Sequence, residues 1–104
     1  MQSKKKSEVQ RGKPTRYLFR IYIAGNGPNS MIALTNLQNL CEEWALDWEL
    51  EIVDVMEAAE RAMDDKILVT PTLIRLAPLP VVHIWGNLSD KDVVISALGL
   101  HRSA

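Results

Sequence analysis

The chain has 104 residues, of which 47% are hydrophobic and 24% charged, with one cysteine and a formal net charge of −1. A chain of this size buries about two thirds of its unfolded surface, so a single domain is expected to fold without disulfides or metal. No run approaches about 18 apolar residues, and no apolar segment follows the basic start, which predicts a cytoplasmic protein with neither membrane span nor secretory signal. The single thiol excludes an intramolecular disulfide, a two-cysteine redox cycle and a cysteine-based zinc cluster, so we expect no metal and no cofactor.

The charge is divided unevenly along the chain. Residues 1–16 hold six basic residues against one acidic, and residues 17–104 hold six against twelve, giving +5 and −6. The first segment has no apolar periodicity, which predicts a disordered basic arm at 1–16 and a folded domain at 17–104. Such an arm can contact nucleic acid, but the acidic domain behind it would repel a polyanion, so no nucleic-acid partner is expected.

The first predicted element is a central strand at 17–24, which is β-branched and aromatic almost throughout and ends at a Gly/Pro-rich turn. Asn29 or Ser30 is then expected to cap a helix whose apolar residues recur three and four apart as far as Trp44. Cys41 lies on that apolar stripe, which indicates a small buried hydrophobic residue rather than a reactive thiol.

Residues 48–55 alternate apolar and acidic before becoming fully apolar, which predicts a strand parallel to the first, because a helix of about fifteen residues suits a right-handed βαβ crossover. Strong helix formers fill 56–66. Residues 72–77 and 81–85 are two further strands joined by a short Pro-rich link, which favours an antiparallel hairpin. Ser89 with Asp92 resembles a capping box that opens a last helix through Leu98.

The resulting order, β-α-β-α-β-β-α, is that of the thioredoxin fold, and two motifs strengthen the resemblance. Asn26-Gly27-Pro28-Asn29 stands where a thioredoxin carries Cys-Gly-Pro-Cys, and Thr70-Pro71-Thr72 stands where thioredoxins hold a cis-proline. Asparagine is neither nucleophile nor leaving group for disulfide exchange, so the two amides are expected to act as turn and cap residues or to bind an anion at the helix start.

The acidic pairs of the chain do not suggest catalysis either. Asp64-Asp65 and Asp90/Asp92 have no neighbouring histidine or glycine-rich phosphate loop. They are interpreted as helix-end and cap residues, and the chain is predicted not to be an enzyme.

Three strings narrow the resemblance to one family. Residues 22–30 (YIAGNGPNS), 65–73 (DKILVTPTL) and 78–89 (PLPV through GNLS) resemble, in the same order and with nearly the same spacing, segments of the KaiB family of clock proteins. The resemblance implies a binding protein that joins the ATPase KaiC, competes with a sensor kinase and captures KaiA. It also implies two folds: a thioredoxin-like βαβαββα form, which we expect here, and a tetrameric ground state with a rebuilt C-terminal half as the alternative.

The expected fold-switch region contains Pro71, Pro78 and Pro80, because X-Pro bonds hold the cis form at a cost of only about 0.5–1 kcal/mol and exchange slowly. Ala97 and Gly99 stand where family members have a glycine and then an acidic residue. Alanine favours helix over glycine by about 1 kcal/mol, so Ala97 is expected to stabilise the thioredoxin-like form.

The resemblance implies partner contacts at Lys66 and Arg75, which match basic family positions, with Glu51 in place of a family lysine. Asn26 and Asn29 of the loop complete the expected partner surface. The predicted function is a non-catalytic KaiB-like adaptor for a KaiC-type ATPase, with KaiA or a sensor kinase as further partners.

The alternative function is a stand-alone oligomeric sensor or stress-response module, without a KaiC partner or redox activity. Self-association as a dimer or tetramer is expected, with Trp48 at the interface, because aromatic residues supply large buried areas.

Overall fold

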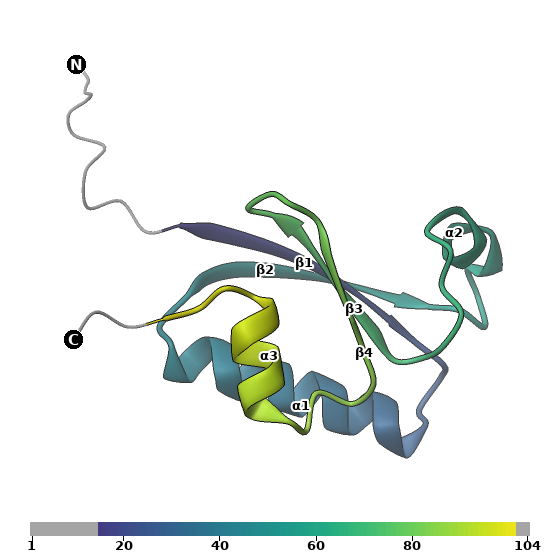
Figure 1. The fold of residues 1–104 in the computed structure, drawn as a ribbon. Helices are drawn as coiled ribbons and strands as arrows, with labels where there is room; N and C mark the ends of the chain where they lie inside the picture. The colour runs from purple at the N-terminus through teal and green to yellow at the C-terminus, as the bar shows by residue number, and fades with distance from the viewer. Residues whose placement is uncertain (1–14, 102–104) are drawn as a thin grey trace.

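Within residues 15–101, which the computed structural model describes, four strands form one sheet in the order β2-β1-β3-β4 and three helices flank it (Figure 1). The elements in chain order are β1 (Arg16–Ile23), α1 (Pro28–Glu43), β2 (Asp47–Asp54), α2 (Ala59–Asp64), β3 (Thr72–Ala77), β4 (Val82–Trp85) and α3 (Lys91–Ala97).

The strand at the centre of the sheet is β1, as its apolar composition predicts. It runs parallel to β2, with Ile21 opposite Ile52, and antiparallel to β3, where Ile21 lies opposite Leu73. The fourth strand pairs antiparallel with β3. The predicted βαβ unit followed by a helix and a ββα unit is therefore confirmed.

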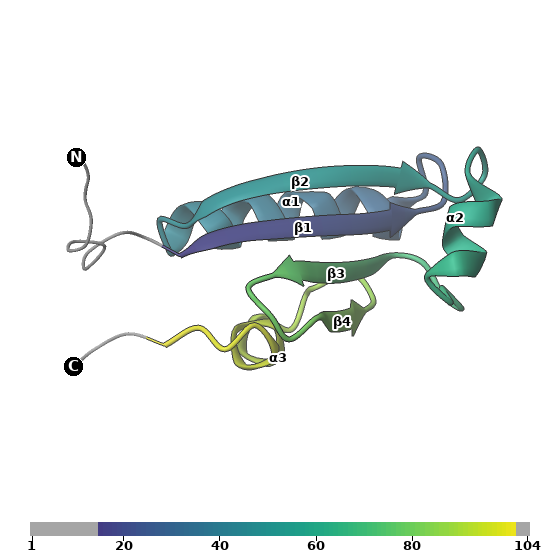
Figure 2. The same ribbon diagram turned by 90° about the horizontal axis from the view of Figure 1, so that it is seen from above.

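The helices cover the two faces of the sheet unequally. Helices α1 and α3 lie on one face, whereas the short α2 lies over the opposite face at the end of the sheet (Figures 1 and 2). Because side chains alternate along a strand, Ile21 and Ile23 enter the first face and Tyr22 enters the second.

The core between the sheet and the α1/α3 pair is mainly apolar, and the one charged side chain buried beside it in the described residues is Arg75. Its buried members include Phe19, Ile21, Leu37, Leu73 and Leu98. The cluster under α2 has four buried members, Tyr22, Val53, Ala62 and Ile74. Most of the apolar burial that stabilises the fold therefore lies on the α1/α3 side.

The predicted helix caps are wrong. Helix α1 starts at Pro28 without a side-chain cap, since proline suits the first turn and Ser30 instead accepts a hydrogen bond from the Ala24 N–H at 3.3 Å. Helix α3 is capped by Asp90, whose carboxylate accepts from the Val93 N–H at 3.3 Å, and not by Ser89. The α3 error arises because Ser89 and Asp90 are adjacent and both residue types cap helices well.

The last helix ends beside Ala97 and Gly99, the two residues that were expected to influence which fold the chain adopts. Ala97 is the final residue of α3, and Gly99 follows the C-cap with φ +70°. Glycine adopts this left-handed conformation without the strain that a side chain introduces. The two residues therefore suit a helix that stops here.

Strand β1 includes Arg16, the last residue of the predicted arm. Arg16 pairs with Asp47 across the sheet, and its guanidinium lies 2.6 Å from that carboxylate and 3.2 Å from Glu49. Residues 1–14 of the predicted arm lie outside the described residues. Of the helices in the described range, none is both long and apolar enough to cross a membrane.

Candidate functional site

The loop between β1 and α1 occupies the position of a thioredoxin active site. Gly25 has φ +58°, and its N–H donates to the Asp54 carboxylate at the end of β2 at 3.1 Å. The Gly27 N–H donates to the Ala24 carbonyl at 3.3 Å. Side chains and backbone groups at the ends of two parallel strands thus fix the loop.

Segments from the second half of the chain meet this loop. Asn87 donates from its amide to the Asn29 side-chain oxygen at 3.2 Å, and its carbonyl accepts from Asn36 of α1 at 3.0 Å. The Gly86 N–H donates to the Pro71 carbonyl at 2.9 Å. The loop, Pro71 and Gly86–Asn87 therefore form one end of the molecule.

Both asparagines of the Asn-Gly-Pro-Asn loop are exposed. Asn29 also accepts a hydrogen bond from Asn87, far along the sequence. The Thr70–Pro71 bond is cis, as the thioredoxin resemblance implies, and so are Ala77–Pro78 and Leu79–Pro80. The end of the molecule thus has thioredoxin geometry with amides in place of thiols.

The lone thiol does not supply the missing chemistry. Cys41 is buried in α1 on the apolar core, and burial, with a smaller contribution from Glu42, raises the pKa of its thiol to about 12. A thiol with such a pKa is not a nucleophile at neutral pH. The prediction that Cys41 acts as a small hydrophobic residue is confirmed.

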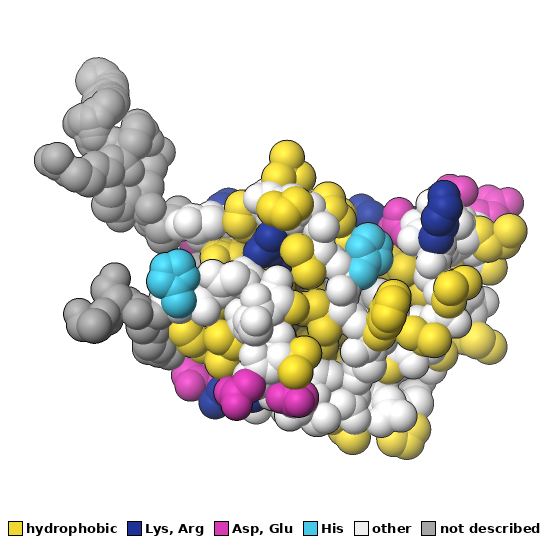
Figure 3. Space-filling view, in the orientation of Figure 1, with side chains coloured by type: hydrophobic (Ala, Val, Ile, Leu, Met, Phe, Trp, Pro, Cys, Tyr) yellow, Lys and Arg dark blue, Asp and Glu magenta, His cyan; other side chains and the backbone are white. Residues whose placement is uncertain are grey.

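Large apolar side chains are exposed around this end. Trp85, the last residue of β4, is 72% exposed and lies opposite Thr72, while Leu68 is 91% exposed in the segment before Pro71. Hydrophobic atoms gather over this end of the molecule in Figure 3. Clustered exposed apolar residues of this kind mark interaction sites.

Neither Leu68 nor Trp85 was predicted from the sequence as a contact residue. The one sequence feature that could have indicated the exposure of Trp85 is its position at the end of a strand, directly before Gly86.

The two predicted basic contacts are placed very differently. Lys66 is exposed two residues after the end of α2, and α2 lies near the same end of the sheet as the loop (Figure 1). Arg75 is buried, and its guanidinium donates to the carbonyls of Leu98 at 2.6 Å and Pro80 at 2.9 Å. The expectation that Arg75 is exposed to a partner is wrong, because the charge is used to join β3 to the end of α3 and to the β3–β4 turn.

Glu51 belongs to an ion-pair network on the α2 face. Its carboxylate accepts from Arg20 at 2.7 Å and from Arg61 at 2.8 Å. The hydrogen bond from Arg61, followed by that from Arg20, lowers the pKa of Glu51 to about 2. Glu51 therefore neutralises two arginines of its own chain.

The same network reaches the buried tyrosine under α2. Arg20 also donates to Asp65 at 3.2 Å, and the Tyr22 hydroxyl contacts both the Asp65 carboxylate and, at 3.1 Å, the Arg61 carbonyl. Burial, with the Asp65 hydrogen bond next, raises the pKa of Tyr22 to about 12. The tyrosine thus remains a neutral hydrogen-bonding group that holds α2 on the sheet.

Trp48 lies on the outer strand β2 and is half-buried. Its ring meets Phe19 edge-on, with centroids 6.4 Å apart. Part of its surface therefore belongs to the core, and of the two strand tryptophans Trp85 is the more exposed.

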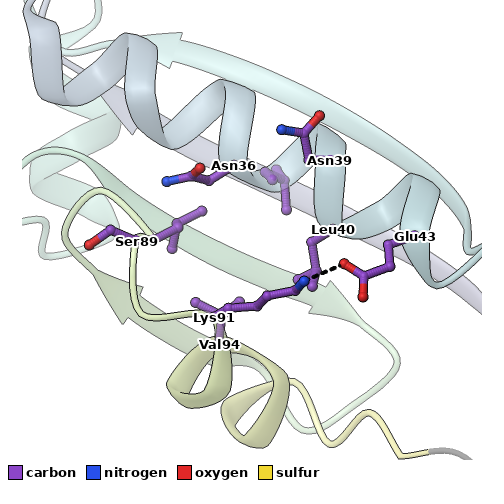
Figure 4. Close-up of a pocket in the computed structure, with 9 residues that line it drawn as sticks. Asn36, Asn39, Leu40, Glu43, Ser89, Lys91 and Val94 are labelled. Carbon is purple, nitrogen blue, oxygen red and sulfur yellow. Dashed lines mark ion pairs between the residues drawn. The ribbon is translucent and has the colours of Figure 1, made fainter.

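A hollow with a volume of about 220 Å³ lies between α1 and α3. Figure 4 shows Asn36 and Asn39 of α1 on one side and Ser89 and Lys91 on the other. The Lys91 ammonium lies 2.6 Å from the Glu43 carboxylate across the hollow. This ion pair links the two helices. No group of three metal-ligating side chains occurs in the part of the chain that is described.

These features define a protein of the thioredoxin-like class whose active-site position carries no thiol. A family model described as the KaiB domain matches residues 20–100. The circadian clock oscillator protein KaiB of Synechococcus elongatus is 45% identical over 85 residues, which cover 81% of this chain and 83% of that protein. The chain belongs to the KaiB family.

Solved structures show the same fold at low sequence identity. The N-terminal domain of Synechococcus elongatus SasA has a TM-score of 0.67 at 17% identity and covers 86% of this chain and 90% of its own. The germline-specific thioredoxin Deadhead of Drosophila melanogaster has a TM-score of 0.64 at 13% identity, covering 89% of both chains. The predicted thioredoxin-like fold and family are therefore confirmed.

Proposed function

We propose that this chain is a non-catalytic, clock-related adaptor that binds a KaiC-type ATPase and modulates its output. The observation that carries the proposal is a thioredoxin-like site, held by Asp54, Asn87 and Pro71, in which amides replace both thiols. Such a site has no group for disulfide exchange but keeps a shaped surface for protein contact. Membership of a family whose relatives are named circadian clock oscillator proteins supports the clock context.

The proposed contact surface is the end of the sheet that carries the loop and α2. Asn26 offers an exposed amide, Lys66 a positive charge, and Leu68 a large apolar side chain. A cation beside apolar surface suits an acidic, partly apolar face of a partner. Glu51 contributes indirectly, because it holds Arg61 of α2 and so fixes the helix that precedes Lys66.

KaiA, captured in the complex, is a further proposed partner, and a sensor kinase is proposed to compete with this chain for the ATPase. The SasA N-terminal domain shares the fold of this chain. A shared fold supports competition, because two proteins that compete for one surface need similar shapes.

The test is gel filtration with light scattering of the chain mixed with a purified KaiC-type ATPase from the same organism. We expect co-elution of the two proteins. Lys66→Gln should weaken the complex by about tenfold, the loss of one charged contact worth about 1.4 kcal/mol. Lys91→Gln, which removes the same charge beside the α1/α3 hollow, is the matched control and should bind normally.

An absence of co-elution at tens of micromolar would refute the proposed partner. Equal weakening by both lysine variants would refute the proposed surface.

Self-association through Trp48 is a separate proposal. Trp48 lies on the outer strand β2, where a second copy could cover its exposed part. Light scattering of the chain alone should give a dimer or tetramer, and Trp48→Ala should lower that mass. An unchanged mass would remove Trp48 from the interface.

A further inference from the structure

The outer strand β4 has backbone groups without a neighbouring strand. It is the last strand of the sheet and pairs only with β3. The Gly86 N–H points toward β3, because it donates to the Pro71 carbonyl just before that strand. Along an antiparallel strand, successive residues point their backbone groups to opposite sides. Val82 and Ile84 therefore bond to β3, whereas the N–H and C=O groups of His83 and Trp85 point outward.

A hollow of about 150 Å³ lies beside this edge, between β4 and α3. Ile84 and Trp85 line it from the strand, and Val93 and Val94 from the helix. Trp85 is 72% and Val93 55% exposed, so apolar surface is available on both sides. Figure 3 looks onto this region and shows hydrophobic atoms at the bottom of the hollow.

The hollow has one sign of charge. Asp90 lines it, Asp92 follows in the first turn of α3, and within residues 15–101 no lysine or arginine lines it. Lys91, between the two acids, is directed to Glu43 of α1. A positive side chain in the hollow would therefore meet uncompensated negative charge.

We propose that the outer edge of β4 and the hollow beside α3 bind an extended peptide segment of another protein. The segment adds a fifth strand by bonding to the outward backbone groups of His83 and Trp85. Alternate side chains of the segment contact Val93 on one face and the Trp85 ring on the other. A lysine or arginine of the segment reaches Asp90.

The charge of the hollow favours a partner segment over a second copy of this chain. A second β4 would bring the sequence Val81-Val82-His83-Ile84-Trp85, which contains no lysine or arginine to pair with Asp90. The inference does not depend on the proposed ATPase partner, because it concerns a different surface from that of Lys66 and Asn26.

The probe is a blocked synthetic peptide, Lys-Thr-Val-Thr-Val-Thr-Lys, titrated into the isotopically labelled full chain and followed by amide NMR. We expect saturable shifts at His83, Trp85 and Val93. The same peptide with N-methyl groups on two consecutive residues keeps its charge and side chains but loses backbone donors. It should bind about tenfold more weakly, since each lost net hydrogen bond costs a few-fold in affinity.

Two protein variants locate the site. His83→Pro removes an outward N–H without removing a bond to β3, and edge strands tolerate proline at such positions, so it should lose binding while His83→Ala keeps it. Asp90→Asn keeps the helix cap, because asparagine caps as well as aspartate, but should weaken the lysine peptide several-fold.

Four outcomes would overturn the proposal: no saturable binding, equal binding of the N-methylated peptide, shifts confined to the other outer strand β2, or self-association of the chain that His83→Pro abolishes. The last outcome would assign the edge to a second copy. Should His83→Pro not fold, the N-methylated peptide and Asp90→Asn decide the question alone.

Discussion

The two faces of the sheet are built by different physical means. The α1/α3 face is mainly an apolar core to which Phe19 and Leu73 contribute, with the buried Arg75 at its edge. The α2 face has a cluster of four buried hydrophobic residues in the described range, and around it α2 is held by Tyr22, Asp65, Arg20 and the Glu51 bridge. Apolar burial is insensitive to salt and pH, whereas exposed ion pairs are weakened by both.

This difference bears on the proposed function. Lys66 lies two residues after the end of α2, so the presentation of its charge depends on the polar face of the protein. Conditions or substitutions that loosen α2 should alter partner binding while the α1/α3 core stays intact. The following four substitutions test the comparison.

The largest effect is expected for Phe19→Ala. The ring is 2% exposed and packs between Tyr17 and Trp48. Removing it should lower the free energy of unfolding by about 3–5 kcal/mol, through lost burial and the cavity left behind. Urea denaturation followed by circular dichroism measures the change. A loss below about 1 kcal/mol would show that this face does not carry the core.

A smaller and local effect is expected for Tyr22→Phe. The substitution removes the hydroxyl between Asp65 and the Arg61 carbonyl but keeps the ring in its apolar cluster. The cost should be about 1–2 kcal/mol. Hydrogen exchange should become faster in α2 and stay unchanged at Leu73. Equally faster hydrogen exchange on both faces of the sheet would contradict the claim that the two faces are stabilised independently.

Ala97→Gly tests the end of the α1/α3 face. Glycine at the last position of α3 should destabilise the helix by about 0.5–1 kcal/mol. Backbone chemical shifts of residues 91–98 should lose part of their helical character. Unchanged shifts and stability would mean that Ala97 does not favour the helical form.

The smallest effect at neutral pH is expected for Glu51→Gln, under about 1 kcal/mol, because the ion pairs are exposed and screened. The pKa of Glu51 is lowered from 4.5 to about 2, so its stabilisation is complete above pH 4.5 and is lost as the pH falls through about 2. The difference in free energy of unfolding between the variant and the unsubstituted chain, measured by urea denaturation, should shrink as the pH falls through this range. It should also shrink in about 0.5 M salt.

The matched control for this substitution is Glu60→Gln, which removes the same charge from α2 outside the network. A pH dependence shared by both variants would mean that general charge, and not the Glu51 bridge, is responsible.

The features that the sequence predicted best are the secondary-structure elements that depend on neighbouring residues. The β-branched run at 17–24, the helical spacing of Leu34, Leu37 and Leu40, and the Pro-rich link at 78–80 specify a strand, a helix and a hairpin from nearest neighbours alone. The position of Cys41 on the helical stripe was sufficient to predict its burial. The order of the elements then predicted the thioredoxin-like fold, and the Thr70-Pro71-Thr72 motif predicted the cis bond at Pro71.

The sequence could not predict what depends on contacts between distant residues. Arg75 is buried because carbonyls of Leu98 and Pro80 converge on it, which no local pattern reveals. Helix α2 begins later than predicted because residues 55–58 form a turn on the Asp54 carboxylate and carbonyl. The exposure of Trp85 follows from β4 being an outer strand, and its apolar sequence resembles that of a central one.

The partner contacts of Lys66, Asn26 and Asn29, the interface role of Trp48 and the exchange between two folds at Pro71, Pro78 and Pro80 stay predictions. Each depends on a second molecule or a second conformation.

The central claim is that the chain adopts the thioredoxin-like form, on which the loop site, the adaptor function and the β4 edge all depend. NMR of the chain in solution tests it most directly. The account predicts β1–β3 and β3–β4 cross-strand contacts, such as Ile21 with Leu73 and Leu73 with Ile84, together with helical shifts at 91–97. Extended shifts at 91–97 with these contacts absent would contradict it.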